Sequence, residues 1–146
     1  MLPPPLLFVA AAATMLALPG VPLWPLWPPS ASQLLAAVPA GLGLLLAVSA
    51  VLALRQAQTQ IDPRHPERSR VLVTHGIYRL SRNPMYLSLL LTLLALSIWR
   101  QSPSTLLPLL AFVLAIRVQI RREEQALARL FGIHFTRYCQ RTRRWI

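Results

Sequence analysis

The fold is decided by residues 84–120, which read PMYLSLLLTLLALSIWRQSPSTLLPLLAFVLAIRVQI. The stretch holds two apolar runs that are separated by a short polar segment. Pro84 suits the first turn of a helix and Asn83 suits its N-cap, so the first run predicts a helix. That helix is expected to cover Met85–Trp99 and to end at Arg100.

The second apolar run begins in the same way, because Ser102 and Pro103 restart the chain after the first helix. We expect its helix to run from Ser104 through Ile120 and to continue as an amphipathic helix to Phe131. Two apolar helices joined by so short a polar segment predict a helical hairpin over these residues.

Two further apolar runs precede the hairpin, at Pro5–Leu23 and Gln33–Leu54. A membrane-spanning helix needs roughly 20 apolar residues, and both runs meet or approach that length. Because the chain starts MLPPPLLF without a positively charged n-region, we expect the first run to be a span rather than a cleaved signal peptide. The second run also carries small residues that suit close helix packing, namely Gly41, Gly43, Ala47 and Ala50.

The expected fold class is all-α, an integral membrane bundle of about four transmembrane helices with a C-terminal cytoplasmic amphipathic helix. A single membrane domain would cover residues 1–146. It would comprise two N-terminal spans at 1–54, a cytoplasmic connector at 55–83, and the hairpin with its C-terminal helix and tail at 84–146.

Composition favours the same class. The chain has 146 residues, of which 55% are hydrophobic and 13% charged, and its mean hydropathy is +0.50. These values are too apolar for a soluble domain of this length. The net charge of +11 comes from arginines placed mostly in two juxtamembrane stretches, so it indicates contact with anionic lipid rather than nucleic acid.

The arginines also predict topology. Only Arg100 lies in the loop opposite the two arginine-rich stretches, so a multi-pass protein with both termini cytoplasmic is expected, in the inner membrane if the source is bacterial. Trp24 and Trp27 between the first two spans fit an interfacial aromatic belt. The segment DPRHPERS at 62–69 predicts a turn-rich loop.

Several classes of site lack their sequence signature. The three histidines are not paired at i, i+4 on a helix, so a zinc site is not indicated, and the single Cys139 cannot form an intramolecular disulfide. The chain has no GxGxxG, GxxxxGK[ST] or GxSxG motif. Nucleotide binding of those types and serine hydrolase chemistry are therefore not predicted.

Two polar segments interrupt the apolar chain at the same predicted membrane face: THGIYRLSRNPMY at 74–86 and RREEQALARLFG at 121–132. In the first, Gly76 permits a tight turn and two tyrosines offer amphipathic rings. Polar residues concentrated at the ends of spanning helices indicate a functional site. Together the segments would suit a zwitterionic ligand with a flat ring.

The helix that carries the second segment separates its two carboxylates. Arg117, Arg121 and Glu124 share one face, and Glu123 points about 100° away from Glu124. One carboxylate could pair with an arginine of its own helix and leave the other for a cationic ligand group. The alternative is that all of these residues form a solvated ion-pair face.

The stretch LVTHGIYRLSRNPMY, the hairpin, REEQALARLFG, Tyr138 and the tail RTRRWI resemble the isoprenylcysteine carboxyl methyltransferase family over about residues 70–146. These membrane enzymes use S-adenosylmethionine and are related to phospholipid N-methyltransferases. The resemblance implies a cofactor site formed by Val71, Leu72, Val73, His75, Gly76, Tyr78, Asn83, Pro84, Met85, Tyr86 and Glu123, with Glu124 as second choice.

The resemblance also implies that Arg117 or Arg121 approaches an anionic group of the substrate. Asn83 stands where eukaryotic members of the family carry His. The acceptor we expect is an amphiphilic, lipid-like or prenylated carboxylate such as a prenylcysteine group, which is ionised at neutral pH and needs no general base. An amine acceptor would have to lose a proton, for which His75 or a tyrosine is available.

Three alternatives remain open from the sequence. The chain could be a phospholipid N-methyltransferase, a nicotinamide-dependent membrane reductase of related fold, or a nonenzymatic membrane subunit with an arginine-rich lipid-binding tail. The lipid bilayer is the expected partner in each case. The sequence does not indicate an oligomeric state.

Overall fold

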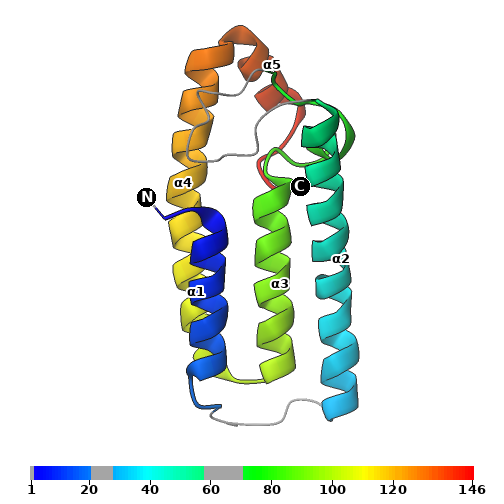
Figure 1. Ribbon diagram of the computed structural model, residues 1–146, viewed down its shortest axis with the longest axis vertical. Helices are drawn as coiled ribbons and strands as arrows, with labels where there is room; N and C mark the ends of the chain where they lie inside the picture. The colour runs from blue at the N-terminus through cyan, green and yellow to red at the C-terminus, as the bar shows by residue number, and fades with distance from the viewer. Residues whose placement is uncertain (1, 21–27, 58–70) are drawn as a thin grey trace.

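The computed structural model describes residues 2–20, 28–57 and 71–146, and helices are the only regular secondary structure within them. In Figure 1 the longer helices lie side by side along one axis, and a shorter helix lies at one end. The α-helices are α1 (Pro4–Ala17), α2 (Pro29–Gln56), α3 (Pro84–Arg100), α4 (Leu106–Phe131) and α5 (Ile133–Arg141). Two short 3-10 helices, η2 (Gly76–Arg79) and η3 (Pro103–Thr105), precede α3 and α4.

The all-α class predicted from the sequence is confirmed for these residues, and two of the helical segments are long and apolar enough to cross a membrane. They are α2 and the continuous segment Pro103–Phe131. Both expose large apolar side chains, for example Leu34 and Leu107, each 72% exposed. So much exposed apolar surface on long helices supports a location in a membrane.

The helix α1 is shorter than the expected span Pro5–Leu23, since it has 14 residues and ends at Ala17. Its end has a local cause. Leu18 precedes Pro19, and steric clash with a proline ring pushes the preceding residue out of the helical region, which matches the extended backbone at Leu18 (φ −64°, ψ 135°). Trp24, Trp27 and the segment 62–69 with His65 lie outside the described residues.

The hairpin predicted over residues 84–120 is present. Pro84 occupies the first turn of α3 as expected, and the chain reverses through Gln101 (φ +46°) and η3 into α4. Figure 1 shows α3 and α4 running in opposite directions, with α4 continuing unbroken toward α5. The amphipathic extension ends at Phe131 as predicted, and Gly132 (φ +51°) turns the chain into α5.

A close seam joins α2 to α3. A Cβ atom on Gly43 would lie 3.0 Å from the carbonyl oxygen of Ser88, so only glycine fits at this distance without a shift of the helices. Ala50 is also completely buried. Gly41, in contrast, faces open space and packs against no other helix among the described residues.

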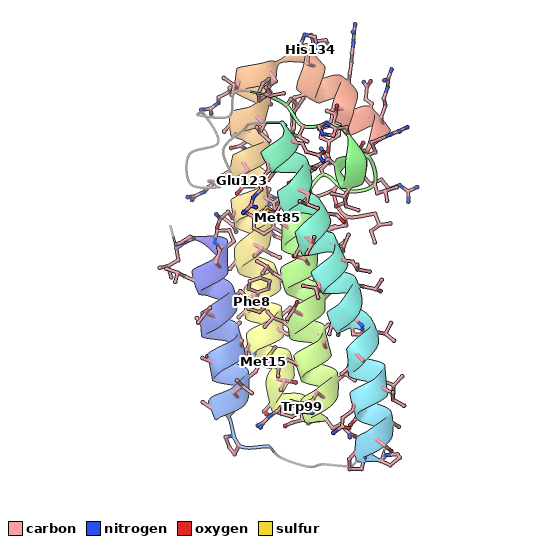
Figure 2. The ribbon with its side chains drawn as sticks, turned by 45° about the vertical axis from the view of Figure 1, so that its right-hand side comes forward. Phe8, Met15, Met85, Trp99, Glu123 and His134 are labelled. Carbon is pink, nitrogen blue, oxygen red and sulfur yellow. The ribbon has the colours of Figure 1, made fainter. Side chains whose placement is uncertain are left out.

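The apolar core is formed by α1, α3 and α4. Met15, Leu93 and Ile116 have no exposed surface, and Tyr86 and Ile120 extend the same cluster toward α5. Figure 2 shows Phe8 and Met15 on the side of α1 that faces the rest of the bundle.

Arg100 lies at the end of the bundle opposite α5, as its isolated position in the sequence predicted. One guanidinium nitrogen donates to the carbonyl oxygen of Leu18 at 2.7 Å, which stabilises the last turn of α1. The first described residues and the C-terminus lie in the half of the molecule that contains α5 (Figure 1). Which side of a membrane this half faces stays a prediction.

Candidate functional site

The two polar segments meet at the α5 end of the bundle. Tyr86, in the first turn of α3, donates its hydroxyl hydrogen to Oε1 of Glu123 on α4. The buried amide of Gln119, one helical turn before Glu123, hydrogen bonds to both of these side chains. A carboxylate, a phenol and an amide from two helices therefore form one connected group.

The position of Glu123 follows from helix geometry. Residues four apart share a helix face, so Glu123 lies above Gln119 on the side of α4 that also buries Ile116 and Ile120. The carboxylate consequently sits over the end of the apolar core. Figure 2 shows Glu123 and Met85 beyond Phe8 and Met15 along the bundle axis.

Tyr78 forms a further wall of this group. Gly76, with φ of +59°, makes the tight turn that was predicted and leads into η2, where Tyr78 is half-buried. Burial, and secondarily the nearby Glu123 carboxylate, raise the pKa of Tyr78 above its usual range. Tyr78 therefore stays neutral and can donate a hydrogen bond, but its phenolate is not populated as a base near pH 7.

Glu124 belongs to a different arrangement. Arg82 lies 3.3 Å from its Oε1 atom, Arg144 donates through Nε at 3.2 Å, and a second nitrogen of Arg144 binds Oε2. The side chain of Glu124 is only 15% exposed. Its partners come from the loop before α3 and from the tail, so the expected pairing with an arginine of its own helix, and the alternative of a solvated face, are both wrong for Glu124.

Asn83 also contacts the tail. The sequence predicted that its side chain would cap α3, but the side chain makes no capping hydrogen bond. It donates instead from Nδ2 to the carbonyl oxygen of Arg144 at 3.1 Å. Cys139 lies against the guanidinium of Arg82, which donates to its sulfur.

The remaining predicted site residues fall into two groups. Val73 and Pro84 are buried and Met85 is partly buried, whereas Val71, His75, Gly76, Arg117 and Arg121 are exposed. Leu72 is intermediate. On α4, Arg121 points roughly 160° away from Glu123, so the structure does not bring these two side chains together.

Sequence reasoning missed two residues of the site. Gln119 is an uncharged polar residue inside an apolar helix, and burial of such an amide in a membrane helix is itself a signal of function. Arg144 had no local signal that distinguished it from its arginine neighbours. Among residues 2–20, 28–57 and 71–146, no three His, Cys, Asp or Glu side chains are placed to hold a metal ion.

The fold and the site define a class of protein: an apolar helical bundle with a mostly buried acidic site where two polar segments meet. The chain belongs to the phospholipid methyltransferase family, which matches residues 31–134. A protein of Haemophilus influenzae described as uncharacterized is 46% identical over 63 residues, a match that covers 42% of this chain and all of that protein. No solved structure matches the chain significantly.

Family membership agrees with the resemblance drawn from the two polar segments, and it implies a methyltransferase associated with a membrane. The match is broader than the sequence motifs suggested, because it begins in α2 rather than near residue 70. It ends at His134 in the first turn of α5, so the tail that contacts Asn83 and Glu124 lies outside the matched region.

Proposed function

We propose that the protein transfers a methyl group from S-adenosylmethionine to an amphiphilic acceptor at a membrane surface. The observation that carries this proposal is the position of Glu123, which Tyr86 and Gln119 hold where the two polar segments meet. Membership of the phospholipid methyltransferase family supports the reaction class.

The chemistry of these side chains fits the cofactor. S-adenosylmethionine has a cationic ammonium group at its amino acid end and a flat adenine ring. A carboxylate oriented by two neutral donors suits the ammonium group, and the half-buried ring of Tyr78 offers apolar surface for the adenosyl part. We assign the direct contact to Glu123 because Glu124 is already bound by two arginines.

When bound, S-adenosylmethionine supplies a methyl group that its sulfonium has already activated. The protein must hold acceptor and methyl in line, about 3–3.5 Å apart, and exclude water from the reacting atoms. Glu123 would fix the donor, and the buried Val73 and Pro84 with the partly buried Met85 would exclude water beside it. No covalent bond to the protein is required.

For the acceptor we favour an amphiphilic carboxylate of the prenylcysteine type. Such a group is already ionised near pH 7, and the exposed Arg117 and Arg121 on α4 could guide it from the lipid toward the site. The raised pKa of Tyr78 argues against an amine acceptor that depends on a tyrosinate base. An amine would then depend on His75, which is exposed.

The second candidate acceptor is the amine of a phospholipid headgroup. The family match favours it, since phospholipid methylation is the activity in the description of the matched family. The two acceptors differ in what they require from the protein, because only the amine must be deprotonated before it can attack. Replacement of His75 by Ala would therefore slow transfer to an amine more than transfer to a carboxylate.

The test uses purified protein in nanodiscs. Binding of S-adenosylhomocysteine is measured by calorimetry, and transfer of labelled methyl is measured with a farnesylcysteine analogue and, separately, with phosphatidylethanolamine vesicles. We expect Glu123→Gln to weaken cofactor binding about tenfold or more, and Gln125→Ala, an exposed change on the same helix, to leave it unchanged.

Unchanged binding in Glu123→Gln would contradict the assigned role of that carboxylate. A wild-type protein that binds a nicotinamide cofactor instead would favour the reductase alternative. A wild-type protein whose melting temperature responds to neither cofactor would favour a nonenzymatic subunit.

A further inference from the structure

The tail that follows α5 lies against the loop that leads into α3. We call residues Thr142–Trp145 the tail clasp. The backbone N–H of Arg82 donates to the carbonyl oxygen of Arg143 at 3.0 Å, and the hydroxyl of Thr142 donates to the carbonyl oxygen of Arg79 at 3.4 Å. The tail clasp therefore binds the loop partly through backbone atoms.

The carbonyl oxygen of Arg144 is the central acceptor of the tail clasp. It accepts from the Asn83 amide at 3.1 Å and from the Ser81 hydroxyl at 3.4 Å. Ser81 and Asn83 are both buried, at 2% and 8% exposed. Buried polar groups need partners, and the tail supplies the acceptor for both of these side-chain donors.

Glu124 fixes the tail clasp to α4. Its carboxylate binds Arg144 of the tail on one side and Arg82 of the loop on the other. Hydrogen bonding to Glu124 raises the pKa of Arg144. One carboxylate thus joins α4, the tail and the loop.

An apolar contact also fixes the tail clasp to the core of the bundle. Trp145 is partly buried and packs against the core cluster that contains Tyr86 and Ile120. At the other end of the tail, Tyr138 on α5 donates its hydroxyl hydrogen to the carbonyl oxygen of Tyr78 at 2.6 Å. The loop between Tyr78 and Asn83 is therefore held along its whole length.

We propose that Glu124 and Arg144 are positioning residues of the active site. They hold the tail clasp on the loop, and the clasp in turn fixes Asn83 and the first turn of α3, which carries Tyr86 to Glu123. The inference rests on the proposed function. It adds to that function a segment beyond the family match, which ends at His134.

The test uses three variants: Arg144→Gln, Glu124→Gln and the double variant that combines them. The control is Arg143→Gln, whose side chain is exposed. We expect each single variant to weaken S-adenosylhomocysteine binding about 3- to 30-fold, with KM for the cofactor rising more than kcat falls. The double variant should lose little more than the worse single variant, because both act on one interaction. Arg143→Gln should match the wild type, and Arg144→Lys, which keeps the charge, should recover part of the affinity.

Hydrogen exchange gives a second readout that needs no cofactor. In Arg144→Gln the amide of Arg82 should lose protection while the amides of α2 keep theirs, since the Arg82 N–H donates to the tail clasp. If the wild-type protein binds S-adenosylhomocysteine and Arg144→Gln binds it equally tightly, the positioning role is overturned. A wild-type protein that does not bind the cofactor would defeat the proposed function instead, and exchange at Arg82 would still decide whether the tail clasp exists.

Discussion

The α2–α3 seam allows one prediction to be worked from geometry. In Gly43→Ala the new methyl would lie 3.0 Å from the Ser88 carbonyl oxygen and 3.1 Å from the Thr92 hydroxyl oxygen. The first of these contacts is with backbone, so it cannot be relieved by a side-chain rotation. The two helices must separate by about 0.4 Å to restore an ordinary contact, and overpacking of this kind costs about 1–3 kcal/mol.

Gly41→Ala is the matched control. It lies on the same helix and meets nothing within 4 Å. Both changes gain the same helix propensity, up to about 1 kcal/mol for Gly to Ala, so this term cancels in the comparison. The free energy of unfolding of Gly43→Ala should therefore be lower than that of Gly41→Ala by about 1–3 kcal/mol.

Thermal unfolding in one detergent, followed by circular dichroism, measures this difference. For a chain of this length it corresponds to a melting temperature about 2–10 °C lower in Gly43→Ala than in Gly41→Ala. Equal melting temperatures in the two variants would show that the seam is looser than the structure indicates, and would refute the reasoning.

Three other predictions concern Tyr86, Arg100 and the pair Tyr78 and Tyr138. Tyr86→Phe should weaken S-adenosylhomocysteine binding about tenfold in calorimetry, because a hydrogen bond to the site carboxylate is lost. Arg100→Gln should lower the free energy of unfolding by about 1–2 kcal/mol without changing cofactor affinity, since it removes the donor to Leu18; an exposed arginine of α5 changed to Gln is the control. Burial raises the pKa of Tyr78 and Tyr138, so the folded protein holds these protons more tightly than the unfolded chain. The melting temperature should be insensitive to these groups below about pH 10 and fall above it, and less steeply when both are Phe.

Features that depend on a few neighbouring residues were predictable from the sequence. The positive φ of Gly76, the start of α3 at Pro84 and the end of α4 at Phe131 all follow from local backbone chemistry. The early end of α1 also has a local signal, namely Pro19. The predicted span nevertheless extended to Leu23, because the residues after Pro19 are apolar.

The partners of individual side chains were not predictable, because they depend on segments far apart in the chain. Arg144 lies 20 residues from Glu124, and no sequence feature distinguishes Arg144 from Arg143. Asn83 has the residue type and position of an N-cap, and a local rule therefore assigned it that role. The tail carbonyl that it binds instead becomes available only when the bundle has assembled.

The two adjacent glutamates show how the sequence pattern and the tertiary structure combine. Helix geometry alone requires Glu123 and Glu124 to face in different directions. The tertiary contacts then give them different charge environments: Glu124 is neutralised by Arg82 and Arg144, while Glu123 accepts hydrogen bonds from the neutral side chains of Tyr86 and Gln119. A carboxylate held by neutral donors over an apolar core keeps its attraction for a cation, so of the two it is Glu123 that is suited to bind the ammonium group of a ligand.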